Sequence, residues 1–125
     1  MPRQTVEDEQ IVVTLDGLGN AITTGVKGYV SRPYNFKIVG WVILADASGS
    51  IVIDVWKDTL GNFPPTVADT ITGTEKPTLS SQTNNTDTSL TSWTTAYTAG
   101  DVLGFNVDSA TTVTKVTLIL NIKRT

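Results

Sequence analysis

The stretch YNFKIVGWVILADASGSIVIDVWKD, residues 34–58, constrains the fold of this chain more than any other part of the sequence. Its β-branched and aromatic residues predict two long strands joined by a turn at residues 46–49. One face of that hairpin carries the apolar residues Phe36, Ile38, Val42, Leu44, Ile51, Ile53 and Val55. The opposite face is also apolar and carries Val39, Trp41, Ile43, Val52 and Trp56.

A hairpin with one face in water alternates apolar and polar residues, and this segment does not. Its second face must therefore be covered by the chain itself, by a neighbouring subunit or by a ligand. Large aromatic side chains contribute strongly to subunit contacts. We therefore predict that this second face forms an oligomer interface, made by Val39, Trp41, Ile43, Val52 and Trp56.

The rest of the sequence predicts one all-β domain. A chain of 125 residues fits a single domain, and its 39% apolar content is typical of globular proteins. Short alternating runs recur between Gly and Asp turns, and no window shows helical spacing with caps. We predict an antiparallel β-sandwich, jelly-roll-like, over residues 11–125, preceded by a polar arm at residues 1–10. An immunoglobulin-like sandwich has the same patterns, so the strand order stays open.

Four further strands are expected, at residues 11–15, 26–31, 101–108 and 112–123. Alternation predicts their inward residues to be Ile11, Val13, Leu15, Val26, Gly28, Val30, Leu103, Phe105, Val107, Thr114, Val116, Leu118, Leu120 and Ile122. Residues 59–99 are rich in Thr, Ser, Asn and Pro. There we expect two or three short strands that cross between sheets, with residues 80–88 as an exposed tip.

Composition argues against several classes of function. The chain has no histidine and no cysteine, which excludes Ser–His and Cys–His catalysis and also disulfides. Its net charge is −3 and its only basic cluster is Lys123-Arg124, so we expect no nucleic-acid partner. No apolar run approaches the ~18 residues of a membrane span, and the first ten residues lack the apolar core of a signal peptide. We expect synthesis in the cytoplasm and no membrane association.

Candidate chemical sites are weak. Scattered carboxylates at Asp46, Asp54, Asp58 and Asp69 do not form a calcium loop, so turn and surface roles are expected for them. A glycosidase would need two carboxylates at a cleft, and Asp54 is the only candidate. Alternation places Asp54 beside Trp56, at a rim or paired. We expect no enzyme activity, no cofactor and no metal. An aromatic platform for sugars is the remaining possibility, and its candidates are Trp41, Trp56, Trp93, Tyr29, Tyr34 and Tyr97.

Three phrases resemble a small all-β domain found in virion proteins of tailed bacteriophages. They are ADASGSIVIDVWKD at residues 45–58, NFPPTVADTITG at residues 62–73 and SLTSWTTAYTAGDVLGFNVDSATTVTKVTLIL at residues 89–120. The resemblance covers nearly the whole chain after the acidic arm, and it carries no catalytic residues. It implies a virion structural protein that is a homo-oligomer, with a trimer as the expected state.

Three functions remain open at this point. The first is a capsid decoration, or cement, protein that binds the outer capsid surface as a homotrimer, with the major capsid protein as partner. Its arm would grip the shell through Arg3, Gln4, Val6 and Glu7. The second is a tail-tip or fibre-head module that binds a host receptor, with tail proteins and a host glycan as partners. The third is a carbohydrate-binding module. The lack of a shaft and of an attachment domain favours the first.

Overall fold

The structure is a computed structural model that describes the backbone of residues 8–125 and the side chains of residues 9–125. Regular structure in this part of the chain is β apart from two short 3-10 turns, and no helix here is long and apolar enough to cross a membrane. The elements are β1 (Asp8–Asp16), β2 (Gly25–Ser31), β3 (Phe36–Asp58), η1 (Leu60–Asn62), η2 (Val67–Asp69), β4 (Thr78–Asp87), β5 (Ala96–Tyr97), β6 (Val102–Thr111) and β7 (Lys115–Arg124).

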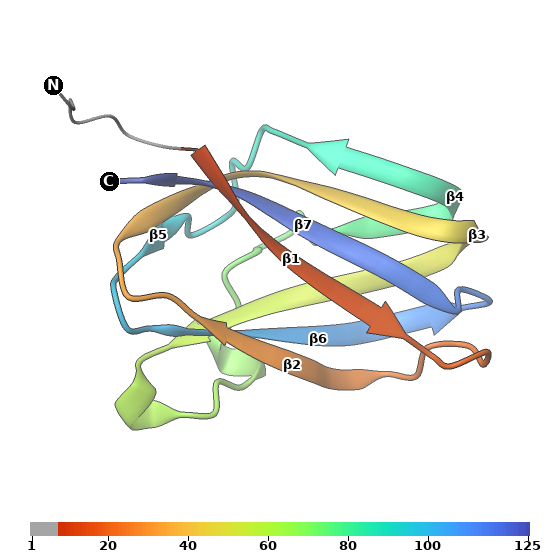
Figure 1. The fold of residues 1–125 in the computed structure, drawn as a ribbon, viewed down its shortest axis with the longest axis horizontal. Helices are drawn as coiled ribbons and strands as arrows, with labels where there is room; N and C mark the ends of the chain where they lie inside the picture. Colours follow the sequence, from red (N-terminus) through yellow and green to blue (C-terminus); the bar gives the residue numbers. More distant parts are fainter. Residues whose placement is uncertain (1–7) are drawn as a thin grey trace, which may run out of the picture.

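The seven strands form one antiparallel sheet that curls into two facing layers (Figure 1). Its main path runs β1-β7-β3-β6-β2. The first half of β3 pairs with β7 and the second half pairs with β6, so β3 belongs to both layers. β4 follows β3 along the other edge, and β5 pairs with the start of β3. The predicted antiparallel sandwich is confirmed.

The long apolar ribbon forms, but its halves are not paired with each other. Trp41 lies between Asp87 of β4 and Leu120 of β7, whereas Ile51 lies between Leu79 of β4 and Ala110 of β6. The predicted hairpin is therefore wrong, because the two halves lie in opposite layers. Figure 1 shows β3 and β4 turning back together at one end of the molecule.

The change of direction in β3 coincides with a shift in its register against β4, between Leu44 and Gly49. Gly49 is buried there, and a Cβ atom on it would lie 2.6 Å from a methyl group of Val113 and 2.9 Å from the carbonyl oxygen of Thr111. Only glycine allows the turning strand to pass this close to the connection between β6 and β7.

A bulge at Val39 changes which side chains of β3 face the core. Ile38 pairs with Ile122 and Gly40 pairs with Asn121, so one residue of β3 is left over and alternation restarts one position later. Trp41 and Ile43 consequently join Phe36 and Ile38 inside, at 4% and 0% exposure, while Leu44 is 42% exposed. The predicted inward positions of Val42 and Leu44 are wrong for this reason.

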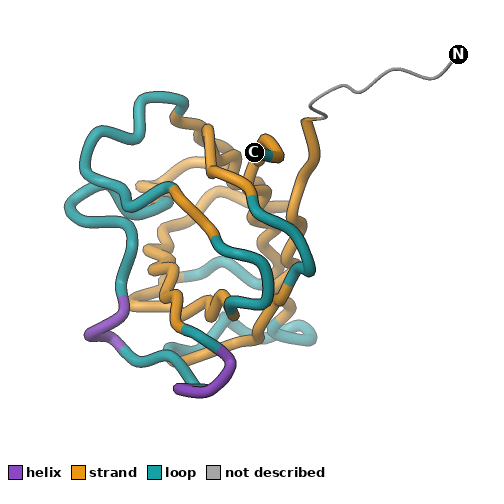
Figure 2. The backbone as a smooth tube through the Cα atoms, turned by 90° about the vertical axis from the view of Figure 1, so that its left-hand side faces the viewer, coloured by secondary structure: helices purple, strands orange, loops and turns teal. Residues whose placement is uncertain are grey.

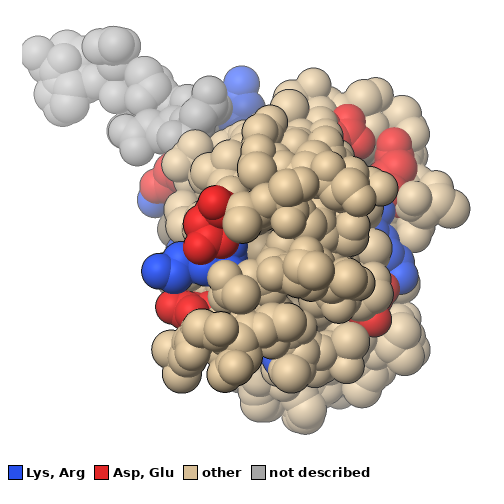
Figure 3. Space-filling view, turned by 90° about the vertical axis from the view of Figure 1, so that its right-hand side faces the viewer, with Lys and Arg blue, Asp and Glu red and all other residues tan. Residues whose placement is uncertain are grey.

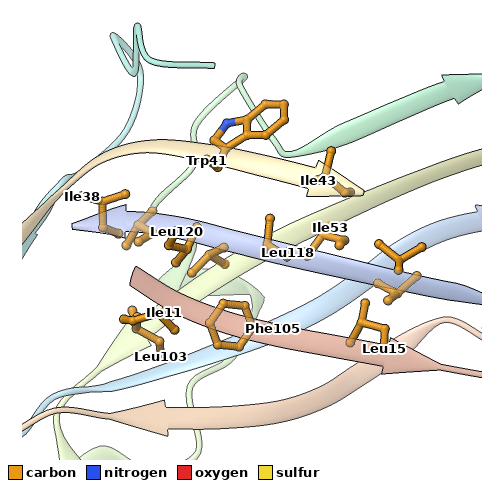
Figure 4. Close-up of a cluster of buried hydrophobic side chains, with 14 of the residues drawn as sticks. Ile11, Leu15, Ile38, Trp41, Ile43, Ile53, Leu103, Phe105, Leu118 and Leu120 are labelled. Carbon is orange, nitrogen blue, oxygen red and sulfur yellow. The ribbon is translucent and has the colours of Figure 1, made fainter. Parts of the chain in front are cut away.

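The core fills the space between the layers with side chains from β1, β3, β6 and β7 (Figure 4). Most predicted inward residues of the other strands are confirmed as buried, namely Ile11, Leu15, Leu103, Phe105, Val107, Val116, Leu118, Leu120 and Ile122. Val13 and Val30 pack against this core while partly buried. Val26 is an exception at 39% exposure, because the pairing of β2 with β6 shifts between Val26 and Gly28.

The polar segment 59–99 forms the strands β4 and β5 and both 3-10 turns. The expected number of strands is therefore confirmed, although β4, with ten residues, is not short. The expected exposure of residues 80–88 is also confirmed, since none of them is buried, but most of them belong to β4 and pair with β3 instead of forming a loop. Figure 2 shows the two 3-10 turns, in purple, outside the strands, one at the left and one at the bottom of that view.

Candidate interaction surface

The layer formed by β2, β6 and the second half of β3 has an outer face that is covered by the chain itself. The cover is the connection between β3 and β4, residues 59–77. Trp56 pairs with Gly104 on one side and bridges to Thr70 of the connection on the other, and it is 9% exposed. A Cβ on Gly104 would lie 3.3 Å from the ring of Pro65, so the connection also lies over this strand. We call this surface the covered face.

A buried carboxylate fastens the connection to the covered face. Asp54 is 1% exposed, and its Oδ1 accepts hydrogen bonds from the hydroxyls of Thr70 at 2.6 Å and Thr72 at 2.8 Å. Its Oδ2 accepts the indole N–H of Trp56 at 2.9 Å and lies 3.7 Å from the Lys76 ammonium. Both oxygens are therefore occupied by groups of this chain. Of the two positions left open for Asp54, at a rim or paired, the paired one is observed, and the turn or surface role expected for this aspartate is wrong because its side chain is buried.

Opposing effects act on the pKa of Asp54. Burial raises it, whereas the hydrogen bonds from Thr70, Thr72 and Trp56 and the charge of Lys76 lower it. The net result is a pKa below the usual value for an aspartate. The group is therefore held ionised, as expected for a structural anchor whose donors all favour the charged form.

The other layer has an outer face that no segment of the described residues covers. Its side chains stand in cross-strand rows, because Val12 of β1 pairs with Ile119 of β7, which pairs with Val42 of β3. Val12 is 55% exposed, and Leu44 in the next row is 42% exposed. We call this surface the bare face. It consists of Gln10, Val12, Thr14, Val39, Val42, Leu44, Thr117, Ile119 and Asn121.

Charged residues lie only at the two ends of the bare face. At one end Lys123 pairs with Asp8 on β1 and with Lys37 on β3. At the other end Lys115 pairs with Asp16, their charged atoms 3.9 Å apart, and the exposed Asp46 follows Ala45 on β3. The surface between these rows is aliphatic, amide and hydroxyl. A strip of this kind suits another protein surface better than a charged polymer.

The end of the molecule at which β3 and β4 turn also has no surface region where charged side chains of a single sign cluster. Figure 3 shows acidic and basic side chains next to one another at both margins of this view, with an uncharged middle. Binding along a phosphate backbone needs clustered cations, and none gather on this end.

A hollow of about 460 Å³ lies at the margin of the bare face, lined by Glu9, Gln10, Val39, Asn121 and Ile122. Beside it, Glu9 accepts hydrogen bonds from Arg124 at 2.9 Å and from the Tyr34 hydroxyl at 2.6 Å. The Arg124 guanidinium also lies 3.8 Å from the centre of the Tyr34 ring. These bonds, from Arg124 first and then Tyr34, lower the pKa of Glu9. They tie the start of β1 to the end of β7.

The structure does not bring the five predicted interface residues together. Trp41 and Ile43 are in the core, Trp56 lies beneath the connection, and Val52 is partly buried in the other layer. Only Val39, at 37% exposure, belongs to the bare face. The expected second apolar surface on β3 is therefore corrected to one carried by Val39, Val42 and Leu44 together with residues of β1 and β7. The predicted anchoring residues Arg3, Gln4, Val6 and Glu7 lie outside the described residues.

The proposed sugar platform is not assembled either. Trp41, Trp93 and Tyr97 are buried at 7% exposure or less, and Tyr34 is partly buried beside Arg124. Tyr29 is the exception at 44% exposure, and its ring meets that of Phe63 edge-on at 4.8 Å. The scattered aspartates do not converge, and residues 9–125 hold no group of three or more acidic side chains placed to bind a metal.

Comparisons with known proteins leave the family of this chain open. No family model and no curated protein matches it. Among solved structures, a chain of the "Structure of infectious bursal disease virus Gx strain" is similar at 15% identity, with a TM-score of 0.24. The likeness covers 95% of this chain and 39% of that chain, so this chain spans about two fifths of the length of its viral neighbour. At this TM-score the likeness carries no argument about function.

Proposed function

We propose that this chain is a virion structural protein that acts by binding other protein surfaces, as a capsid decoration or cement protein. The observation that carries the proposal is the bare face. Three strands present aliphatic side chains to solvent in rows without charge, while the other outer face is covered by the same chain. Apolar surface rimmed by polar residues is typical of a protein–protein contact site.

The virion location is supported by the sequence resemblance to a domain of tailed-phage virion proteins. In this proposal the chain forms a homotrimer on the outer capsid surface, with the major capsid protein as its partner. Trp41 and Ile43 cannot provide the subunit contacts, because both are enclosed in the core. The apolar area for assembly comes instead from the bare face.

The free energy available from burying the bare face indicates an assembly that depends on many weak contacts. Burying the five aliphatic side chains of the bare face, each already partly shielded, contributes about 1 kcal/mol apiece. Loss of translational and rotational freedom opposes association by ~4–15 kcal/mol. One such contact is therefore marginal, whereas repeated contacts on a symmetric shell reinforce one another. This balance suits a protein that acts on a lattice.

Gold-labelled antibodies against the purified chain, applied to purified virions, test the proposal. We expect label distributed over the head surface, and peptides of the chain in mass spectra of the same particles. Virions without label and without these peptides would contradict a structural role in the particle.

A second candidate, a receptor-binding module of a tail tip or a carbohydrate-binding module, is favoured by one observation. Tyr29 and Phe63 form an exposed aromatic pair on the side opposite the bare face. Aromatic rings of this kind bind the apolar faces of sugars. Glycan-array binding that is lost in Tyr29→Ala and Phe63→Ala variants, or gold label confined to the tail, would favour this candidate over the capsid.

A further inference from the structure

We propose that the side of β1 that faces away from β7, which we call the free edge, binds an extended segment of another protein. The segment adds to the sheet as a further strand, and it has aliphatic residues at its centre and Lys or Arg at its ends. The free edge is separate from the bare face, because it consists of backbone groups at the side of the sheet. The inference goes beyond the proposed function and does not depend on it.

The free edge carries backbone groups that no other part of residues 8–125 binds. β1 is an end strand of the sheet, and β2, the strand at the other end, diverges from it in Figure 1 and does not pair with it. In an antiparallel pair such as β1 with β7, every second residue turns both its N–H and its C=O away from the partner strand. Within the described chain, no hydrogen bond reaches the backbone of residues 9–15 from that side. Unpaired edges of this kind are templates for another strand.

The edge strand β4 differs, because its own side chains bind part of its backbone. The side-chain amide of Asn85 donates to the carbonyl of Thr78 at 2.9 Å. The Oδ1 of the same side chain accepts the Thr86 amide, also at 2.9 Å. Ser81, in the middle of β4, has a φ of 51°, which interrupts the extended backbone. Another strand could therefore not follow β4 in register along its length.

The edge strand β2 is interrupted as well. Its pairing with β6 shifts between Val26 and Gly28, and the exposed Lys27 lies in this bulge. Bulges and lysines are common means by which edge strands avoid pairing with other chains. β1 has neither of them within residues 10–15, whose sequence is QIVVTL, and its pairing with β7 continues without a shift over the whole strand. Of these three edges, the edge of β1 is the one that the described chain leaves suited to strand addition.

The side chains of β1 determine which strand fits beside it, because side chains of neighbouring strands contact one another. β1 is acidic at both ends, and its centre is aliphatic, with Val12 exposed. β7 has the matching order of side chains, since KVTLILNIKR is aliphatic at its centre and basic at both ends. Lys115 lies 3.9 Å from Asp16, and Arg124 bonds to Glu9 at 2.9 Å. A further strand beside β1 therefore needs the same composition as β7.

Charge disfavours a second copy of β1 as the occupant. The strand, DEQIVVTLD, contains three acidic residues and no basic residue. Two copies paired edge to edge would bring these like charges together, which opposes association, whereas basic ends on the added strand would favour it. The occupant is therefore a segment of a different protein.

Amide hydrogen exchange of the full chain, followed by NMR with and without a synthetic KVTLILNIKR peptide, tests the inference. Every second amide of residues 9–15 bonds to β7 and exchanges slowly in the free protein. We expect the amides between them to exchange about tenfold more slowly at about 1 mM peptide, as for an edge that is about nine-tenths occupied. The amides of β2 and β4 are internal controls and should be unchanged. Peptide that slows no amide of β1, or that slows those of β2 or β4 instead, would overturn the inference.

Two changes to the peptide separate the contributions of backbone and charge. A peptide with N-methylated amides lacks backbone donors and should leave the exchange of β1 as in the free protein. A peptide with Glu in place of each Lys and Arg should need an about tenfold higher concentration for the same protection. Equal protection by all three peptides would overturn the inference. Slowed exchange of the same amides at high protein concentration, without peptide, would identify a second copy as the occupant and would also overturn it.

Discussion

The two outer faces of this sandwich differ in how they are covered, although one strand, β3, contributes to both. The covered face lies under residues 59–77, which cover Trp56 and engage both oxygens of Asp54 through Thr70, Thr72 and Lys76. The bare face leaves Val12 and Leu44 about half exposed, and no described segment lies over it. Asp54 and its hydrogen-bond donors, which we call the polar anchor, lie on the covered face. The exposed aliphatic rows lie on the bare face.

This difference indicates which surface is available for assembly. On the covered face, the carboxylate and three donors fix a connection that would otherwise be loosely held, since its apolar residues are few. On the bare face, aliphatic side chains contribute little to the isolated fold because they remain in water. Their contribution arises only when another surface covers them. The following changes probe this division between the faces.

Adjacent residues of β3 provide the largest expected contrast. Trp41 is enclosed in the core and its indole N–H has no hydrogen-bond partner within residues 8–125, so its contribution is packing. Trp41→Ala is expected to lower the free energy of unfolding by about 3–5 kcal/mol. Val42 points to the bare face, and Val42→Ala should cost about 1 kcal/mol or less. Urea unfolding of both variants measures these losses. Equal losses of unfolding free energy would contradict the bulge at Val39, which places Trp41 in the core and Val42 outside it.

Removal of the polar anchor should have the next largest effect. Asp54→Ala leaves the Trp56 indole and two threonine hydroxyls without their acceptor, and we expect a loss of about 2–4 kcal/mol. The matched control is Asp46→Ala, an exposed aspartate of the same strand, which should change stability by less than about 0.5 kcal/mol. Hydrogen exchange should also show lost protection at the Ile71 amide, which bonds to Val55. An unchanged Ile71 amide would contradict the anchoring role.

Acid should weaken the covered face through the same group. Because the pKa of Asp54 is lowered in the folded state, its ionisation stabilises the fold fully above the unfolded value of about 3.9. That stabilisation is lost as the pH falls through the lower folded pKa. The stability difference between wild type and Asp54→Asn is therefore expected to be constant above about pH 5 and to shrink below about pH 4. Denaturant unfolding of both proteins from pH 2.5 to 7 measures this difference. A difference that grows in acid would mean that the pKa of Asp54 is raised in the folded state, which would contradict the account.

The smallest expected effect on stability is on the bare face. Leu44→Thr replaces an exposed aliphatic side chain with a β-branched polar one that suits a strand, so stability should change by less than about 0.5 kcal/mol. Self-association measured by sedimentation should nevertheless weaken. A variant that unfolds easily, or that associates as wild type does, would argue against the division between the faces.

Alternation of apolar and polar residues was sufficient to predict much of this fold. The faces of residues 11–15, 102–107 and 115–123 were predictable because those strands pair without a bulge at their buried positions. Val12 and Ile119 could be assigned outward for the same reason. The predicted inward position of Thr114 is wrong, because β7 begins only at Lys115 and the neighbouring Val113 is the buried residue. Strand order could not be predicted, so nothing in the sequence placed Val12 and Ile119 beside Val42 in one row.

The interface prediction failed for Trp41 and Ile43 because of a single local feature, and for Val52 and Trp56 because the second half of β3 lies in the other layer. A bulge at Val39 reverses the faces of every residue after it until the turn, and alternation alone does not reveal where a bulge occurs. Gly40 was the available signal, because an isolated glycine within a strand pattern often marks a bulge. A Cβ there would lie 3.0 Å from the carbonyl oxygen of Asp87. Cover of Trp56 by residues 59–77 depends on a long connection whose path has no short-range signal.

The most direct test of the central claim, that the bare face is the assembly surface, is carbene footprinting of the protein in intact virions and in dilute solution. We predict that labelling of Val12, Val42 and Leu44 falls severalfold in the virion, while labelling of Tyr29 and Phe63 is unchanged. The opposite pattern, with Tyr29 and Phe63 protected and the bare face labelled as in free protein, would contradict the account.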